Sequence, residues 1–137
     1  MKLIVLCGIP GSGKTTLSKQ IENEYGMTRR SFDELKIFHK RDFIPYIVDS
    51  LEKNEDVVAD APHTDLKTRL ELLKSIEHID CEKILIFLNL SFEECVHRNA
   101  QRHQPLPYFV VKSFYDRLEE PTLDEGWDEI IYYKGEW

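Results

Sequence analysis

The sequence lacks several features that would place it in a special class of protein. Its 137 residues contain no apolar run close to the roughly 18 residues of a membrane-spanning helix. The apolar run at the N-terminus is too short for a signal peptide. Internal repeats, linkers and low-complexity segments are also missing. These absences predict a single domain over residues 1–137 that does not contact a membrane.

Cysteine is scarce, and its placement is uninformative about metals or disulfides. The three cysteines, Cys7, Cys81 and Cys95, are scattered and show no metal-binding or redox spacing. Cys7 and Cys95 are expected to be small buried apolar residues. This use of cysteine predicts a reducing, cytoplasmic setting.

Positive charge is also in short supply. The chain has 18 Lys and Arg against 25 Asp and Glu, which gives a formal net charge of −7 and argues against a general nucleic-acid binder. The excess is uneven, because residues 119–137 hold seven acidic residues and one basic residue. The rest of the chain is therefore close to neutral, which leaves room for a local basic cleft.

A specific phosphate-binding motif stands near the start of the chain. Residues 8–15 read GIPGSGKT and fit the P-loop pattern G-x-x-x-x-G-K-[ST]. The apolar run 2–7 predicts a buried strand before it, and the spacing in residues 15–25 predicts an amphipathic helix after it. The alternative is a chance match in a glycine-rich turn, but such a match would not need a strand before it and a helix after it. A strand, a glycine loop and a helix N-terminus direct backbone N–H groups at phosphate, so we expect a bound nucleoside triphosphate.

Strands and helices are predicted to alternate along the rest of the chain. Strands are expected at residues 27–31, 57–60, 83–90 and 129–133, and helices at 32–39, 44–51, 65–77, 92–102 and 108–118. In the helix at 65–77, the residues expected to face inward are Leu66, Leu70, Leu73 and Ile76. The alternation predicts an α/β fold with a central, mostly parallel sheet and helices on both faces. Ligands of such sheets bind at the carboxyl ends of the strands.

Two acids that follow predicted strands are candidates for the acceptor side of a phosphotransfer site. Asp33 lies just beyond strand 27–31, where a kinase needs a carboxylate to take the proton of a hydroxyl; a helix N-terminal acid is an equally good interpretation. Lys36, on the same face of the expected helix, could hold an anionic acceptor or be a solvated lysine. Asp60 ends strand 57–60 and could hold Mg²⁺ through water or anchor the acceptor; a turn acid is the alternative.

Two arginines are placed where a lid would supply them. Arg98 and Arg102 are four residues apart on one helix face and precede the proline-marked loop 103–107. A mobile lid brings such arginines to a transferring phosphate, although an ordinary solvated helix face is also possible. His63, which directly follows Ala-Pro, is expected to be a loop residue and not a ligand.

With these residues placed, the chain resembles the small P-loop kinases of the polynucleotide 5′-hydroxyl kinase type, and in particular the bacteriophage kinase domain. The likeness covers most of the chain. It rests on GIPGSGKTT at 8–16, SFDELK at 31–36, VVADA at 57–61, RNAQR at 98–102 and PLPYFVVKSFYDRL at 105–118. It implies a nucleotide-kinase-like, three-layer P-loop NTPase fold with a helical lid. The family's arginine for the acceptor phosphate appears here as Lys36, a point charge in place of a bidentate fork.

The resemblance implies a role for each candidate. ATP is expected to be bound by Gly8, Pro10, Gly11, Ser12, Gly13, Lys14, Thr15, Thr16, Arg98 and Arg102. Asp33 is expected to be the general base, and Lys14 and Arg102 to stabilise charge on the transferred group. Lys36 and Asp60 are expected on the acceptor side, and Thr15 and Asp60 at Mg²⁺.

We therefore expect transfer of the γ-phosphate of ATP to a hydroxyl, with the 5′-hydroxyl of a polynucleotide as the acceptor. Two alternatives stay open. One is a kinase of a small metabolite or nucleotide, because one fold serves many acceptors. The other is an ATP-binding regulator without transfer activity.

Overall fold

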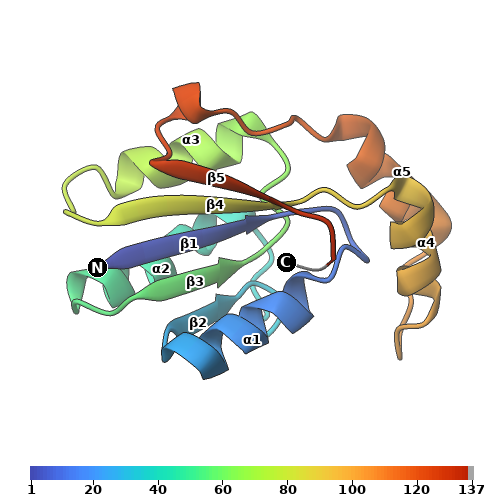
Figure 1. Cartoon of the computed structure of the whole chain (residues 1–137), viewed down its shortest axis with the longest axis horizontal. Coiled ribbons are helices and arrows are strands. Elements are labelled where there is room, and N and C mark those ends of the chain that lie inside the picture. Colours follow the sequence, from blue (N-terminus) through green and yellow to red (C-terminus); the bar gives the residue numbers. More distant parts are fainter. Residues whose placement is uncertain (136–137) are drawn as a thin grey trace.

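A parallel sheet forms the centre of the molecule in the computed structural model, which describes residues 1–135. Within these residues, five strands pair in the order β2-β3-β1-β4-β5, all of them parallel (Figure 1). The strands are β1 (Lys2–Cys7), β2 (Thr28–Ser31), β3 (Val57–Asp60), β4 (Glu82–Leu88) and β5 (Glu129–Tyr133). The predicted α/β class and parallel sheet are confirmed.

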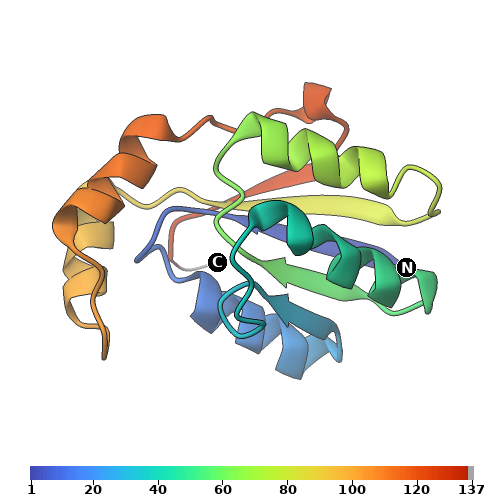
Figure 2. The same cartoon turned by 180° about the vertical axis from the view of Figure 1, so that it is seen from behind.

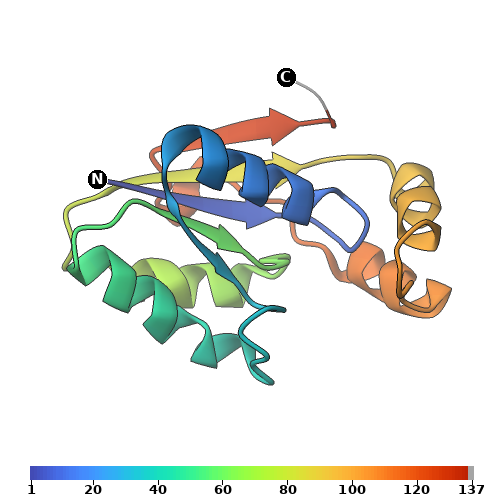
Figure 3. The ribbon, with the colours of Figure 1, turned by 90° about the horizontal axis from the view of Figure 1, so that it is seen from below.

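Helices cover both faces of this sheet. They are α1 (Lys14–Tyr25), α2 (Ile44–Glu52), α3 (Leu66–Ser75), α4 (Phe92–Ala100) and α5 (Tyr108–Arg117). Helix α1 lies on one face, while α2 and α3 lie side by side on the other (Figures 2 and 3). Two apolar clusters follow this division, one containing Leu17 and Ile21 of α1 and one containing Ile47 and Leu72. Among residues 1–135, no helix has the length and apolarity needed to cross a membrane.

Helices α4 and α5 stand beyond the carboxyl ends of the strands, where a lid was expected (Figure 1). A third apolar cluster joins Ile9 of the P-loop to Cys95 of α4 and Val111 of α5. The loop between the two helices is held by the buried Asn99, whose amide donates to the Leu106 carbonyl at 2.8 Å and accepts from its N–H at 3.2 Å. The lid helices are therefore packed directly on the phosphate-binding loop.

The predicted helix at residues 32–39 is wrong. Residues 32–36 form a turn, and a short 3₁₀ helix follows at Lys40–Asp42. Lys36 has a left-handed backbone with φ of 54°, which ends any helical course there. Phe32, Leu35 and Ile37 all pack against the core on the α2 and α3 side. The spacing of these three residues, three and then two positions apart, does not place them on one face of a regular helix.

The inward face of α3 also differs from the prediction. Leu70 is 42% exposed, while Leu72 is 1% exposed and takes its place in the core. Leu73 and Ile76 are buried as predicted. The helix turns this way because it buries Arg69 together with Leu72 and Leu73.

Arg69 forms the centre of a buried ionic cluster. Its side chain is fully buried, and it donates from Nε and Nη2 to the two carboxylate oxygens of Glu125 at 2.8 and 3.1 Å. Trp127 Nε1 donates to the same carboxylate at 3.0 Å. The remaining guanidinium nitrogen, Nη1, donates to the His63 carbonyl at 2.9 Å. Arg69 thus ties the chain before β5 to the loop that follows β3.

Removal of the Arg69 side chain should destabilise the fold strongly. The Arg69→Ala variant leaves the Glu125 carboxylate buried without its cation, a change that typically costs about 3–5 kcal/mol. Urea unfolding of this variant should show a loss of that order. Lys67→Ala, on the exposed face of the same helix, is the matched control and should unfold at nearly the wild-type urea concentration. A loss below about 1 kcal/mol for Arg69→Ala would contradict this account.

Candidate active site

The loop between β1 and α1 has the backbone that a phosphate site requires. Gly11 and Gly13 have φ of 85° and 96°, in the left-handed region that favours glycine. A Cβ at Gly11 would collide with the Cys95 carbonyl oxygen, so the glycine also lets α4 approach the loop. The Gly8 N–H donates to the Pro62 carbonyl at 3.0 Å, which fixes the loop to the segment after β3. The loop therefore sits between the sheet and the lid.

Lys14 lies folded over this loop. Its ammonium donates to the Gly8 and Ile9 carbonyls at 2.9 and 3.0 Å. Burial lowers the pKa of Lys14, and the charges of Asp60 and Asp33 partly oppose that effect. A charged lysine at the edge of the loop, with carboxylates nearby, is suited to move onto an incoming phosphate.

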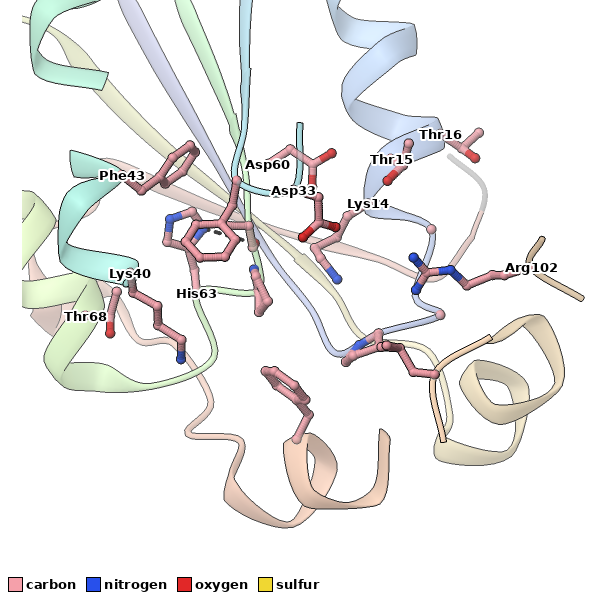
Figure 4. Close-up of a pocket in the computed structure, with 18 of the residues that line it drawn as sticks. Lys14, Thr15, Thr16, Asp33, Lys40, Phe43, Asp60, His63, Thr68 and Arg102 are labelled. Atoms are coloured by element: carbon pink, nitrogen blue, oxygen red, sulfur yellow. Dashed lines mark hydrogen bonds between the residues drawn. The ribbon is translucent and has the colours of Figure 1, made fainter. Parts of the chain in front are cut away.

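A cavity of about 800 Å³ opens next to the P-loop at the carboxyl ends of the strands (Figure 4). Lys14, Thr15 and Thr16 line it on one side, and Asp33 and Asp60 approach from the ends of β2 and β3. Arg98 and Arg102 close it from the lid. Its apolar lining comes from Phe32, Phe38, Phe43, Ile44, Leu72, Leu106 and Phe114. A phosphate-binding half and a largely apolar half thus share one space.

Most of the predicted site residues meet at this cavity. The lining includes Pro10, Gly11, Gly13, Lys14, Thr15, Thr16, Asp33, Asp60, Arg98 and Arg102. Lys36 lies outside the lining that residues 1–135 provide, and the helix that was expected to align it with Asp33 is a turn. Arg98 donates to Glu94 at 2.9 Å within α4. Its guanidinium also lies near the P-loop, because a Cβ added to Gly13 would be 3.4 Å from Arg98 Nη1.

Asp60 is held by groups that the sequence did not single out. Its Oδ2 accepts from Ser18 Oγ at 2.7 Å and from Arg29 Nη2 at 3.0 Å, and Arg29 Nε donates to the same Ser18 oxygen at 2.7 Å. Arg29 also pairs with Glu34 at 2.8 Å. The Phe32 N–H donates to the Asp60 carbonyl at 3.0 Å. Arg29 and Asp60 together thus hold the turn that carries Asp33 beside the P-loop.

Lys40 is a second residue that the sequence did not reveal. It lines the cavity, where its ammonium donates to Asp65 Oδ1 at 3.1 Å and lies 6.0 Å from the centre of the Phe114 ring. It connects the 3₁₀ turn, the start of α3 and the lid helix α5. No motif or spacing links Lys40 to the P-loop, because its position depends on the irregular course of residues 32–39.

His63 follows β3 in a loop, as expected, but it is almost completely buried. Its side chain lines the cavity, and only 4% of the residue is exposed. Nδ1 lies 2.9 Å from the Leu6 carbonyl oxygen and 3.1 Å from that of Ala61. The ring packs on Phe43 with a centroid separation of 6.1 Å. Burial lowers the pKa of His63 to about 4, so the ring is neutral at pH 7.

This buried histidine predicts a loss of stability in weak acid. Below pH 6.5 the unfolded chain binds a proton that folded His63 does not bind until about pH 4. The free energy of unfolding should therefore fall with decreasing pH, by up to about 1.4 kcal/mol per pH unit. Urea unfolding between pH 6.5 and 5 measures this slope. His63→Asn should flatten it, and an equally steep slope in that variant would show that another group is responsible.

Comparison with known proteins gives the family. Residues 3–121 match the family model described as an AAA domain. A relative, L-seryl-tRNA(Sec) kinase of Methanococcus maripaludis, is 26% identical over an alignment 142 positions long that covers 92% of this chain and 56% of the relative. The bifunctional polynucleotide phosphatase/kinase of Schizosaccharomyces pombe is 28% identical over 134 residues, which cover 94% of this chain and 32% of the relative. The chain thus spans about half and about a third of these proteins.

Solved structures agree on the fold. A fungal RNA kinase superposes with a TM-score of 0.79 at 22% identity, over 99% of this chain and 39% of that one. A sugar kinase from Janibacter gives a TM-score of 0.79 at 16% identity, over 98% and 85% of the two chains. The chain therefore belongs to the AAA-domain family of P-loop proteins, and its fold is that of the P-loop kinases.

Proposed function

We propose that this protein transfers the γ-phosphate of ATP to the 5′-hydroxyl of a polynucleotide. The observation that carries the proposal is that Asp33 lines the same cavity as Lys14 and the lid arginines. A carboxylate opposite a phosphate-binding loop is what a hydroxyl acceptor needs and what nucleotide binding alone does not need. The names of two relatives, a kinase of seryl-tRNA and a polynucleotide phosphatase/kinase, support an acceptor on nucleic acid.

The residues divide the reaction between them. The acceptor oxygen attacks the γ-phosphorus, its proton passes to the Asp33 carboxylate, and the bond to the β,γ-bridging oxygen breaks to release ADP. Lys14 leaves the Gly8 and Ile9 carbonyls to bind the phosphates, and Arg102 stabilises the charge on the transferred group from the lid. Figure 4 shows Asp33, Lys14 and Arg102 around the same space. No covalent enzyme intermediate is required.

The residues present also fit Mg²⁺ bound together with phosphate. Thr15 offers a hydroxyl and Asp60 a carboxylate at the cavity, and oxygen is the ligand that Mg²⁺ prefers. Residues 1–135 contain no group of three or more His, Cys, Asp or Glu side chains that could hold a metal by themselves. A Mg²⁺ ion held by Thr15 and Asp60 would keep water and substrate phosphates as its other ligands. When bound, the ion would neutralise phosphate charge.

The acceptor half of the cavity suits a nucleoside better than a sugar. Phe32, Phe43 and Phe114 contribute aromatic surface, on which bases stack. Lys40 adds a cation within the same half. Single-stranded DNA and RNA with a 5′-hydroxyl, together with nucleosides, sugars and other hydroxyl metabolites, should be tested as acceptors with γ-labelled ATP. Labelled oligonucleotide supports the proposal. Label in a metabolite alone overturns the polynucleotide acceptor, and acceptor-independent binding without transfer indicates a regulator.

Loss of the Asp33 carboxylate should nearly abolish transfer. Asp33→Asn keeps the size of the side chain but removes the base, so kcat should fall by about 10²–10⁴-fold. ATP binding, followed by calorimetry, should stay close to that of the wild type. Asp42→Asn, an exposed acid on the neighbouring 3₁₀ turn, should retain full activity. Near-normal turnover of Asp33→Asn would show that another group accepts the proton.

Lys40 should matter for acceptor binding more than Lys36 does. Lys40→Met removes the cation that lines the acceptor half, and the KM for a 5′-hydroxyl oligonucleotide should rise about tenfold with a weaker dependence on salt. Lys36→Met is the matched change outside the cavity and should leave this KM within about twofold. The reverse order would restore Lys36 as the acceptor-binding residue.

A further inference from the structure

The hydrogen bonds of His63 determine where its proton lies. Nδ1 is within 3.1 Å of two backbone carbonyl oxygens, those of Leu6 and Ala61. Carbonyl oxygens only accept hydrogen bonds, so Nδ1 must be the protonated nitrogen. A neutral imidazole with its proton on Nδ1 carries a lone pair on Nε2 and can only accept there. The backbone around His63 therefore converts Nε2 into a fixed hydrogen-bond acceptor.

No group within residues 1–135 satisfies this acceptor. The hydrogen bonds and ion pairs of His63 reach the Leu6 and Ala61 carbonyls through Nδ1 and Arg69 through the backbone, and none uses Nε2. The imidazole lies beside Phe43, on the side of the cavity where Lys40 and Thr68 also lie (Figure 4). Nε2 is not among the buried side-chain atoms without a partner in residues 1–135, which are Ser12 Oγ and Glu55 Oε1. It is therefore accessible from the cavity that His63 lines, where a bound molecule can donate to it.

The position of the ring is fixed from several sides. His63 has φ of 47°, a left-handed backbone that is uncommon in residues other than glycine, although histidine, asparagine and aspartate adopt it more often than most. Its carbonyl accepts from the buried Arg69 at 2.9 Å, and Arg69 is itself held by Glu125. Phe43 packs against the ring. The backbone conformation, the Nδ1 contacts and the Phe43 ring together hold the imidazole in one orientation at the cavity.

We propose that His63 Nε2 accepts a hydrogen bond from an O–H or N–H group of the phosphoryl acceptor and so positions it in the apolar half of the cavity. This inference rests on the proposed phosphotransfer, because it assigns a contact to the acceptor of that reaction. The contact is a binding one, since Asp33 takes the proton of the attacking hydroxyl. On a nucleic-acid end, the donor group is the 2′-hydroxyl of the terminal ribose or an N–H of the terminal base.

The first test compares two variants of His63. His63→Asn tolerates the left-handed backbone, and its amide can still donate to Leu6, but nothing replaces Nε2. The KM for a 5′-hydroxyl oligonucleotide should rise about five- to tenfold, while the KM for ATP stays within about twofold. His63→Gln, whose longer side chain carries an oxygen farther into the cavity, should recover part of the loss. His39→Asn, an exposed histidine outside the cavity lining, is the control.

The second test identifies the donor group by coupling. Wild type and His63→Asn are assayed with three RNA ends: a complete one, one whose terminal ribose lacks the 2′-hydroxyl, and one whose terminal base is removed. Deletion of the group that His63 binds should raise the KM of the wild type, but it should raise the KM of the His63→Asn variant little further. Additive losses for both deletions overturn the inference, as does an equal rise in KM for ATP and acceptor.

A measurement on the wild type tests the inference without depending on whether the variants fold. In ¹⁵N NMR spectra of imidazole-labelled protein, His63 should show protonated Nδ1 and unprotonated Nε2, and the Nε2 resonance should move on addition of the acceptor. A protonated Nε2, or a resonance unchanged at saturation, overturns the inference. If no oligonucleotide is phosphorylated but a metabolite is, the polynucleotide proposal fails, and the same KM and NMR tests on that metabolite decide the role of His63. If nothing is phosphorylated, both fail.

Discussion

The buried carboxylate of Asp60 is the group on which the arrangement of the site depends. It ends a central strand in a position with little access to water, so its charge must be satisfied by protein groups. Ser18 of α1 and Arg29 of β2 provide them, and Arg29 extends the network to Glu34. A single ionic cluster thus connects the P-loop helix, two strands and the turn that carries Asp33. The contacts that satisfy the buried charge of Asp60 thus also set the distance between the phosphate loop and Asp33, the proposed base.

A second buried charge fixes the opposite side of the cavity. Arg69 and Glu125 hold the loop after β3 through the His63 carbonyl, and they join that loop to the segment before β5. The lid helices contact the P-loop through Cys95, where Gly11 permits close approach. The cavity therefore has two walls that are held by buried ionic contacts, and the lid helices pack on the loop that they would cover. Such a design lets a phosphate and an acceptor be positioned without large rearrangement of the sheet.

The regular parts of this fold could be predicted from the sequence, while its irregular parts could not. The β1 run, the GIPGSGKT loop and α1 are local signals, so the strand, the loop and the helix were found together. The segment 32–39 was misread as a helix, because tertiary burial of Phe32, Leu35 and Ile37 decides its path. The position of Lys40 at the cavity depends on that path, so Lys40 was not predicted as a site residue. Arg69 offered one signal, an arginine three residues after Leu66 and four before Leu73, at an inward position of α3.

The central claim is that ATP and a nucleic-acid hydroxyl occupy the two halves of one cavity. A bisubstrate compound, in which adenosine is joined through a chain of phosphates to the 5′-oxygen of a dinucleotide, tests it directly by calorimetry. If both halves are filled together, it should bind at least about 100-fold more tightly than ATP or the dinucleotide alone. Affinity no better than that of ATP would show that the dinucleotide does not enter the half lined by Asp33 and Lys40, and would contradict the account.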